Sequence, residues 1–176
     1  AAKLRITQNQ DKSDYFIANF DQKNILEQEL SLTKAHVVTF SEESTQADYY
    51  IGEQYLESQA DHEIMKISDI KIPGRHNQQN SLVAIAISKI MGASDEDIRS
   101  VLSTFTGAKH RLQYVMTYNN RRIYNDSKST NIEAASVAIP SFSQPEVLIA
   151  GGLDRGFTFD ELVPLLKKHV KAIVLY

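Results

Sequence analysis

Apolar residues in the first part of the chain fall in short runs separated by polar stretches. The β-branched and aromatic runs at 14–20 and 35–40 predict two buried strands. Residues 21–30 between them place their apolar side chains on one side of a helix, which gives a strand, helix, strand unit. Residues 1–10 favour helix, whereas the scattered Tyr and Ile side chains of 41–70 favour small antiparallel strands.

Two helices are predicted next. In 76–91 the apolar residues nearly encircle a helix, so we expect it to be buried on most sides and to end at Gly92. Ser94 and Asp97 form a capping-box-like start for a helix over 95–105. That helix is expected to bury three apolar side chains, Ile98, Val101 and Leu102.

A domain boundary is predicted near residue 109, because 105–110 contains a glycine and no apolar periodicity. Beyond it the pattern restarts with strands alternating with helices, which indicates a doubly wound parallel sheet and an α/β fold. The expected elements are strands 112–118 and 121–125 around Asn119-Asn120, a helix from about 131, a strand at 146–150, a helix at 159–169 and a strand at 171–176.

Composition narrows the function classes. The 19 basic and 22 acidic residues give a net charge of −3, so no basic surplus favours nucleic-acid binding. The absence of cysteine excludes disulfide scaffolds and is compatible with a cytoplasmic location. No apolar run reaches the roughly 20 residues that span a bilayer, so we expect no membrane insertion. The oligomeric state stays open, with a monomer as the expectation, and both ends of the chain are interpreted as cuts.

The loop 125–131 (NDSKSTN) is the first candidate site. It follows a predicted strand and opens a helix for which we expect Thr130 as the cap and Glu133 as its reciprocal partner. Free N–H groups at a helix start, together with the charge of Lys128 and nearby hydroxyls, suit a carboxylate or a phosphate. An ordinary capped loop accounts for the same residues.

Two further segments can likewise be interpreted either as part of a ligand site or as ordinary local structure. The glycine-rich loop 151–156 allows close approach of a ligand to the backbone and adds Arg155, yet it is also typical of a tight strand-to-helix connection. At the start of the helix over 76–91, Asn77 and Asn80 are three residues apart and suit adenine, but Asn is also a common cap.

Little else in the chain points to a self-contained site. Arg111, next to His110 at the predicted boundary, would reach a phosphate held between two domains. The five histidines lack HExxH spacing, and no GxxxxGK[ST] phosphate loop occurs.

Four segments in this order, PGRHNQQN, FTGAKHRLQYV, YNDSKSTN and LIAGGLDRGFTFDEL, resemble the Mur ligase family, and specifically its D-glutamate-adding branch. The resemblance implies an α/β fold in which residues 1–108 are the later part of the central ATPase domain. Residues 109–176 would be the first part of a carboxy-terminal Rossmann-like domain. It implies ATP-dependent addition of D-glutamate to UDP-N-acetylmuramoyl-L-alanine through an acyl phosphate, with Mg²⁺ assisting, and a fragment that is inactive alone.

Site residues follow from the resemblance position by position. ATP would be contacted by Asn77, Asn80, Arg111 and Asp126. D-glutamate would be held by Lys128, Thr130 and Arg155, the last standing where some members carry Lys. Lys3 matches a lysine that the family carries as a carbamate near Mg²⁺, and Lys3, Lys128 and Arg111 would be the catalytic set.

Other functions stay open. One is a sister ligase that adds diaminopimelate or lysine, or one similar to folylpolyglutamate synthase. A second is a non-catalytic module that binds a nucleotide or an amino acid, and a third is a purely structural role.

Overall fold

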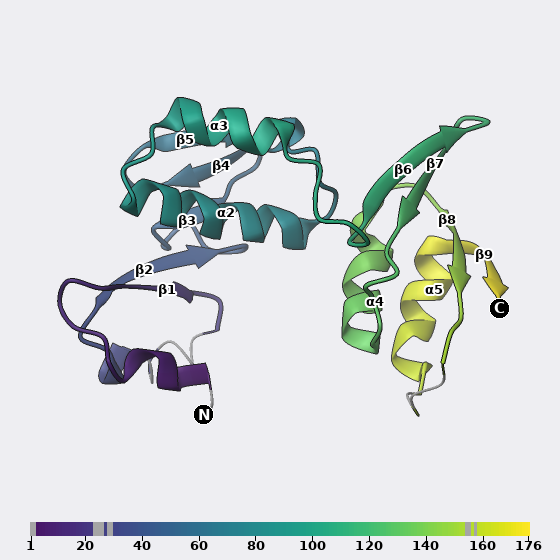
Figure 1. The fold of residues 1–176 in the computed structure, drawn as a ribbon, viewed down its shortest axis with the longest axis horizontal. Helices are drawn as coiled ribbons and strands as arrows, with labels where there is room; N and C mark the ends of the chain where they lie inside the picture. Colours follow the sequence, from purple (N-terminus) through teal and green to yellow (C-terminus); the bar gives the residue numbers. More distant parts are fainter. Residues whose placement is uncertain (1–2, 23–26, 28–29, 154–155, 157) are drawn as a thin grey trace. The chain divides into compact units, whose positions relative to one another are not determined.

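The chain divides into two compact units in the computed structural model. The first unit comprises residues 1–70 and 78–104, and the second comprises 71–77 and 105–176. The structure describes residues 3–22, 27, 30–153, 156 and 158–176 (Figure 1). The assignment of residues 1–108 and 109–176 to two family domains stays a prediction.

The first unit contains short strands followed by two helices. Its strands are β1 (Tyr15–Asn19), β2 (His36–Ser41), β3 (Tyr49–Ile51), β4 (Tyr55–Ser58) and β5 (His62–Lys66). Its helical elements are η1 (Lys3–Thr7), η2 (Ile67–Asp69), α2 (Arg75–Ile90), whose first three residues belong to the second unit, and α3 (Asp95–Thr104).

The five strands form one sheet in the order β1-β2-β3-β4-β5. β1, β2 and β3 are parallel, with Ile17 opposite Val38, and β3, β4 and β5 are antiparallel. The predicted strands at 14–20 and 35–40 and the small antiparallel strands are therefore confirmed. The predicted helix over 21–30 lies largely outside the described residues, and the expected helix over 1–10 is a short 3-10 helix.

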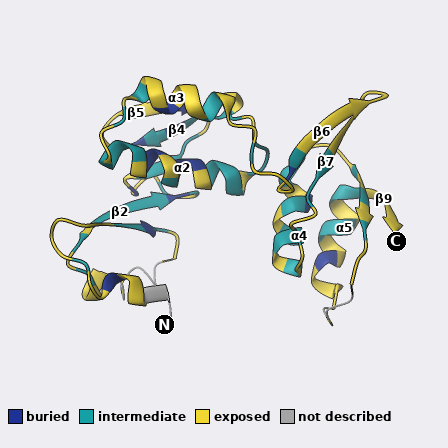
Figure 2. Ribbon diagram, viewed as in Figure 1, coloured by how far each residue is buried: buried dark blue, intermediate teal, exposed yellow. Residues whose placement is uncertain are grey.

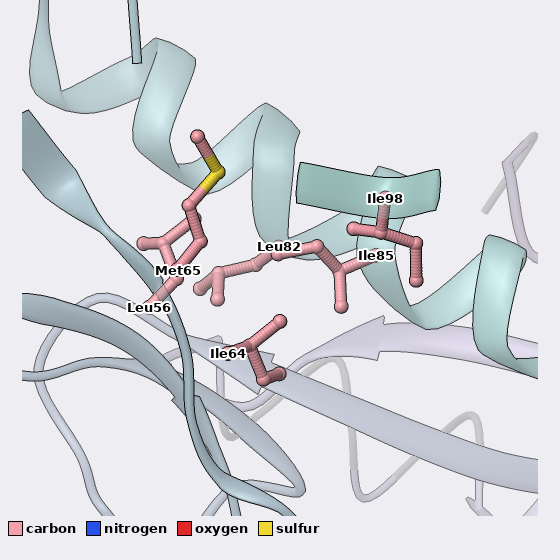
Figure 3. Close-up of a cluster of buried hydrophobic side chains, with 6 residues drawn as sticks. All are labelled: Leu56, Ile64, Met65, Leu82, Ile85 and Ile98. Atoms are coloured by element: carbon pink, nitrogen blue, oxygen red, sulfur yellow. The ribbon is translucent and has the colours of Figure 1, made fainter. Parts of the chain in front are cut away.

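The core of the first unit lies between the antiparallel strands and the two helices. Six apolar side chains form it, at most 5% exposed: Leu56, Ile64, Met65, Leu82, Ile85 and Ile98 (Figure 3). They come from β4, β5, α2 and α3, so each of these elements contributes at least one buried position. Burial of this apolar surface is what holds the helices against the strands.

Helix α2 buries one face rather than most of its surface. Leu82 and Ile85 are fully buried, but Ile87 is 49% exposed, which corrects the prediction. In α3, Val101 is likewise 63% exposed, whereas Ile98 is buried as expected. Apolar side chains all round a helix do not reveal which of them the neighbouring elements cover, because periodicity gives only the angle between positions.

The ends of both helices follow the expected local chemistry. Gly92 ends α2 with φ of 83°, and the N–H groups of Gly92 and Ala93 donate to Lys89 and Ser88 carbonyls at 3.0 and 2.9 Å. This is the Schellman pattern, in which glycine accepts the left-handed conformation without strain. At the start of α3, the Asp97 N–H donates to the Ser94 hydroxyl, which donates to the Asp97 carboxylate.

The second unit contains a β-hairpin followed by alternating helices and strands. Its strands are β6 (Gln113–Tyr118), β7 (Arg121–Asn125), β8 (Glu146–Ala150) and β9 (Val170–Leu175). Its helical elements are α4 (Ile132–Ala138), η3 (Ile139–Ser141), η4 (Asp160–Leu162) and α5 (Val163–His169).

The hairpin is confirmed at the predicted position. Tyr118 pairs with Arg121 across a two-residue turn, and both turn residues, Asn119 and Asn120, have positive φ (47° and 58°). These values match a type I′ turn, which Asn tolerates better than most residues do.

The parallel arrangement expected for the second unit is present in β8 and β9, which pair in parallel with Ile149 opposite Val174. The chain is therefore an α/β protein. Among the described residues, β7 pairs with β6 and does not join β8, so this unit has a hairpin beside a two-stranded parallel sheet. Figure 2 shows exposed residues along much of β6 and β9. No helix in the described part of the chain is long and apolar enough to cross a membrane.

Candidate functional site

The loop that leaves β7 begins α4, and its cap differs from the prediction. Asn131, not Thr130, is the cap: its side-chain oxygen accepts a hydrogen bond from the Ala134 N–H at 2.9 Å. The helix thus starts one residue later than expected, consistent with the stronger capping preference of Asn over Thr. Because α4 has only seven residues, its dipole is weak, and the charge of Lys128 is the main attraction for an anion.

Asp126 joins this loop to the segment that precedes the hairpin. One carboxylate oxygen accepts a hydrogen bond from the Leu112 N–H at 2.9 Å, and the other accepts one from the Ser129 hydroxyl. The Ser129 N–H also donates to the Asp126 carbonyl at 2.9 Å. Hydrogen bonds to an ionised acceptor are stronger than neutral ones, so the carboxylate fixes the two segments together.

A second set of hydrogen bonds ties the same two segments through His110. Its carbonyl accepts a hydrogen bond from the Lys128 N–H at 3.0 Å, and its N–H donates to the Gln113 side-chain oxygen at 3.0 Å. Its ring Nδ1 lies 3.0 Å from Nδ2 of Asn125. Arg111 and Lys128 are therefore brought to one place in the second unit by backbone contacts that flank both of them.

The backbone around Arg111 has an uncommon conformation. His110 and Leu112, the residues on either side, have φ of 66° and 40°. Residues other than glycine rarely adopt positive φ, and such positions persist only where surrounding contacts hold them. Here the contacts are the hydrogen bonds to Gln113, Lys128 and Asp126. The conformation leaves the Arg111 side chain exposed.

Arg111 and Lys128 are both exposed, and among the described residues neither side chain has an ion-pair partner. Two cations on segments that hydrogen bonds of Asp126 join, neither of them ion-paired with that carboxylate, suit an anionic ligand such as a phosphate or a carboxylate. Thr130, two residues after Lys128 in the same loop, is exposed as well and adds a hydroxyl group that a ligand could reach.

The two asparagines predicted to bind adenine lie in the first turns of α2. The Asn77 side-chain nitrogen donates to the Pro73 carbonyl at 2.6 Å, and the Asn77 N–H donates to the Gly74 carbonyl at 3.0 Å. Asn77 therefore also fixes the entry into the helix. Asn80 is exposed on the following turn. Their role toward adenine stays a prediction.

The glycine-rich loop after β8 is required at least partly by packing. A Cβ placed on Gly151 would lie 2.2 Å from the Tyr176 carbonyl oxygen at the end of β9. Only glycine fits so close an approach of the two backbones just beyond the ends of β8 and β9. Gly152 has φ of 117°, which also favours glycine. Arg155, predicted to hold D-glutamate, lies outside the described residues.

Lys3 begins the 3-10 helix η1, and its side chain is not among those described. Its predicted carbamate is therefore not tested. Across the described residues, no group of three or more His, Asp or Glu side chains is placed to hold a metal ion.

Sequence reasoning missed the residues that build the site's framework. Gln113 and Asn125 are opposite each other in the register of β6 and β7, and both bind His110. The sequence offered one signal for this framework, namely two polar side chains at the end of the predicted hairpin that lies away from its turn. Asp126 was assigned to a ligand, whereas the structure shows it also bridging two segments.

Comparisons with known proteins found relatives for nearly the whole chain. A family model described as the Mur ligase middle domain matches residues 1–88. The UDP-N-acetylmuramoylalanine–D-glutamate ligase of Lactobacillus johnsonii is 79% identical over 175 residues, which is 99% of this chain and 38% of that protein. The ligase of the same name from Latilactobacillus sakei is 53% identical with the same coverage. The chain thus spans about two fifths of the curated relatives it matches.

Solved structures show the fold. The MurF crystal structure from Acinetobacter baumannii aligns over 92% of this chain and 38% of its own, with a TM-score of 0.69 and 19% identity. A mutant of L. casei FPGS aligns over 94% of this chain and 50% of its own, with a TM-score of 0.57 and 16% identity.

Proposed function

The chain belongs to the Mur ligase family, and we propose that it is part of an ATP-dependent ligase that adds D-glutamate to UDP-N-acetylmuramoyl-L-alanine. The observation that carries the proposal is the joined pair of segments, 110–112 and 126–130, which presents Arg111 and Lys128 as exposed cations. The names of two similar relatives point to D-glutamate as the amino acid.

In the proposed reaction a carboxylate oxygen of UDP-N-acetylmuramoyl-L-alanine attacks the γ-phosphorus of ATP, and ADP leaves. The amine of D-glutamate then attacks the carbonyl carbon of the acyl phosphate. The resulting tetrahedral intermediate loses phosphate, the nitrogen loses a proton, and an amide remains. Negative charge develops at the phosphate and at the carbonyl oxygen, so fixed cations stabilise the transition state more than the ground state.

Each site residue has a part in this scheme. Lys128 and Thr130 hold the carboxylate of D-glutamate by a charge-assisted and a neutral hydrogen bond, together with Arg155. Arg111 contacts the phosphates of ATP, and Asn77 and Asn80 contact its adenine, as the resemblance to the family implies. Asp126 contacts the ribose. Each of its carboxylate oxygens can accept two hydrogen bonds, and each accepts one from the described residues, so both can still accept a hydrogen bond from a ribose hydroxyl.

We also propose Mg²⁺ as a cofactor, although the described residues include no group of three or more His, Asp or Glu side chains placed to hold a metal ion. When bound, the ion would neutralise phosphate charge. Lys3, as a carbamate, is the proposed contributor from this chain. We also propose that residues 1–108 and 109–176 belong to the central and carboxy-terminal domains, and that the enzyme works in the cytoplasm because it consumes ATP.

The proposal is tested with the complete polypeptide that carries this sequence, by measuring phosphate release from ATP in the presence of the UDP-sugar substrate and different amino acids. D-glutamate should stimulate release, and meso-diaminopimelate and L-lysine should not. Stimulation by another amino acid instead of D-glutamate would establish a sister ligase. Binding of a nucleotide without phosphate release under every condition would indicate a non-catalytic module.

A substitution locates the amino-acid site. Lys128→Ala should raise the KM for D-glutamate about 10- to 100-fold, the loss of one hydrogen bond to a charged group, with the KM for ATP much less affected. Lys167→Ala is the matched control, because Lys167 is an exposed lysine of the same unit on α5. An unchanged KM for D-glutamate in Lys128→Ala would remove Lys128 from the site.

A further inference from the structure

Asn125, the last residue of β7, is absent from the ligand contacts proposed above, yet its side chain is held on both sides. Its oxygen Oδ1 accepts a hydrogen bond from the Ser127 N–H at 3.0 Å, and its nitrogen Nδ2 lies 3.0 Å from Nδ1 of His110. Both contacts lie within the second unit. Together they determine which way the amide faces.

The direction of the amide follows from the chemistry of its neighbours. A backbone N–H only donates, so the atom of Asn125 that faces Ser127 must be the acceptor oxygen. The NH₂ group therefore faces His110, and an amide NH₂ only donates. Nδ1 of His110 must accept this hydrogen bond, so it carries no proton. A neutral imidazole has one N–H, which then resides on Nε2.

The backbone of His110 is fixed as firmly as its ring. Its N–H and its carbonyl are both hydrogen-bonded, to Gln113 and to Lys128, and its φ of 66° directs the chain into Arg111. The residue is exposed, so an Nε2–H group there is available to a ligand from solvent. An exposed donor on the residue before an exposed arginine suits a phosphate group, whose oxygens accept several hydrogen bonds.

We propose that Asn125 is a positioning residue that holds His110 as the Nε2–H tautomer, so that the ring donates to the same phosphate groups that Arg111 contacts. This inference rests on the proposed function for the identity of the anion. The tautomer itself rests only on the contacts of Asn125, so the two parts can fail separately.

The tautomer is measured by nitrogen NMR of the complete polypeptide labelled at histidine, with the His110 signals assigned by comparison with His110→Gln. In the unsubstituted protein, Nδ1 should give an acceptor-type shift and Nε2 a protonated one. In Asn125→Asp the carboxylate accepts from both Ser127 and the ring, so the proton should move to Nδ1. A proton on Nδ1 before substitution, or no change in Asn125→Asp, overturns the proposal.

Kinetics test the link to the nucleotide. Asn125→Asp should raise the KM for ATP roughly fivefold, the factor expected for one lost hydrogen bond, with the KM for D-glutamate nearly constant. The control is Asn120→Asp, the same chemical change at the exposed hairpin turn, where φ is 58°. If the tautomer reverses and the KM for ATP does not change, the positioning role is refuted. If no amino acid stimulates phosphate release, the proposed function fails, while the tautomer result stands.

Discussion

Replacement of Asp126 by alanine tests how the site is held together. The carboxylate accepts hydrogen bonds from the Leu112 N–H at 2.9 Å and from the Ser129 hydroxyl. Leu112 is only 7% exposed and has φ of 40°, so its N–H has restricted access to water once the acceptor is removed. A hydrogen bond to a charged group contributes about 1.5–3 kcal/mol.

The expected local cost is about 2 kcal/mol for the Leu112 contact, which corresponds to a roughly 30-fold larger equilibrium constant for local opening. Amide hydrogen exchange followed by NMR measures it residue by residue: the Leu112 N–H should lose about 30-fold in protection. Ser129→Ala is the control, because it removes the other bond and leaves the Leu112 acceptor in place. Equal protection of Leu112 in Asp126→Ala and the unsubstituted protein would refute the bridging role.

Three further predictions concern stability, measured by urea unfolding. Lys89 forms ion pairs with Asp61 at 2.8 Å and with Asp95 at 2.5 Å, and both raise the pKa of its amine above 10.5. Lys89→Met should lower the free energy of unfolding by about 1 kcal/mol at pH 7. This difference should disappear as the pH rises through the folded-state pKa of Lys89. Burial raises the pKa of Glu146 from 4.5 to about 6, so its ionisation destabilises the fold as the pH rises through that interval. Glu146→Gln should therefore raise the free energy of unfolding by about 1 kcal/mol at pH 7.5, after allowance for solvent screening. At pH 4 it should have no effect, because the carboxyl is largely protonated in both states. Leu82→Ala should cost about 2–5 kcal/mol, since Leu82 is 0% exposed; a cost below 1 kcal/mol would contradict its place in the core.

Local features were predictable wherever neighbouring residues decide the conformation. The Asn119-Asn120 turn, the Schellman end at Gly92 and the Ser94–Asp97 cap all involve residues within about one helical turn of each other. The prediction of Thr130 as the cap of α4 was wrong. The adjacent Asn131 is the cap, and Asn has the stronger capping preference of the two residues.

The sequence indicated the cations of the candidate site, but it did not indicate the hydrogen bonds that hold the two segments of the site together. Lys128 and Arg111 were named from their residue types and from the family pattern. The bridge from Asp126 to Leu112 joins residues 14 positions apart, and the contact between Asn125 and His110 spans 15. No local periodicity specifies such pairs, because they depend on how β6 and β7 return the chain to its starting point.

The sequence by itself determined the order of strands and helices, the turns and the identity of the charged groups, since these follow from side-chain shape and spacing along a few residues. Only the tertiary structure decided which side of α2 is buried, and it joined segments 110–112 and 126–130 through one carboxylate. The physical reason is that burial and hydrogen-bond partners are properties of groups meeting in space, and folding brings together residues that the sequence keeps apart.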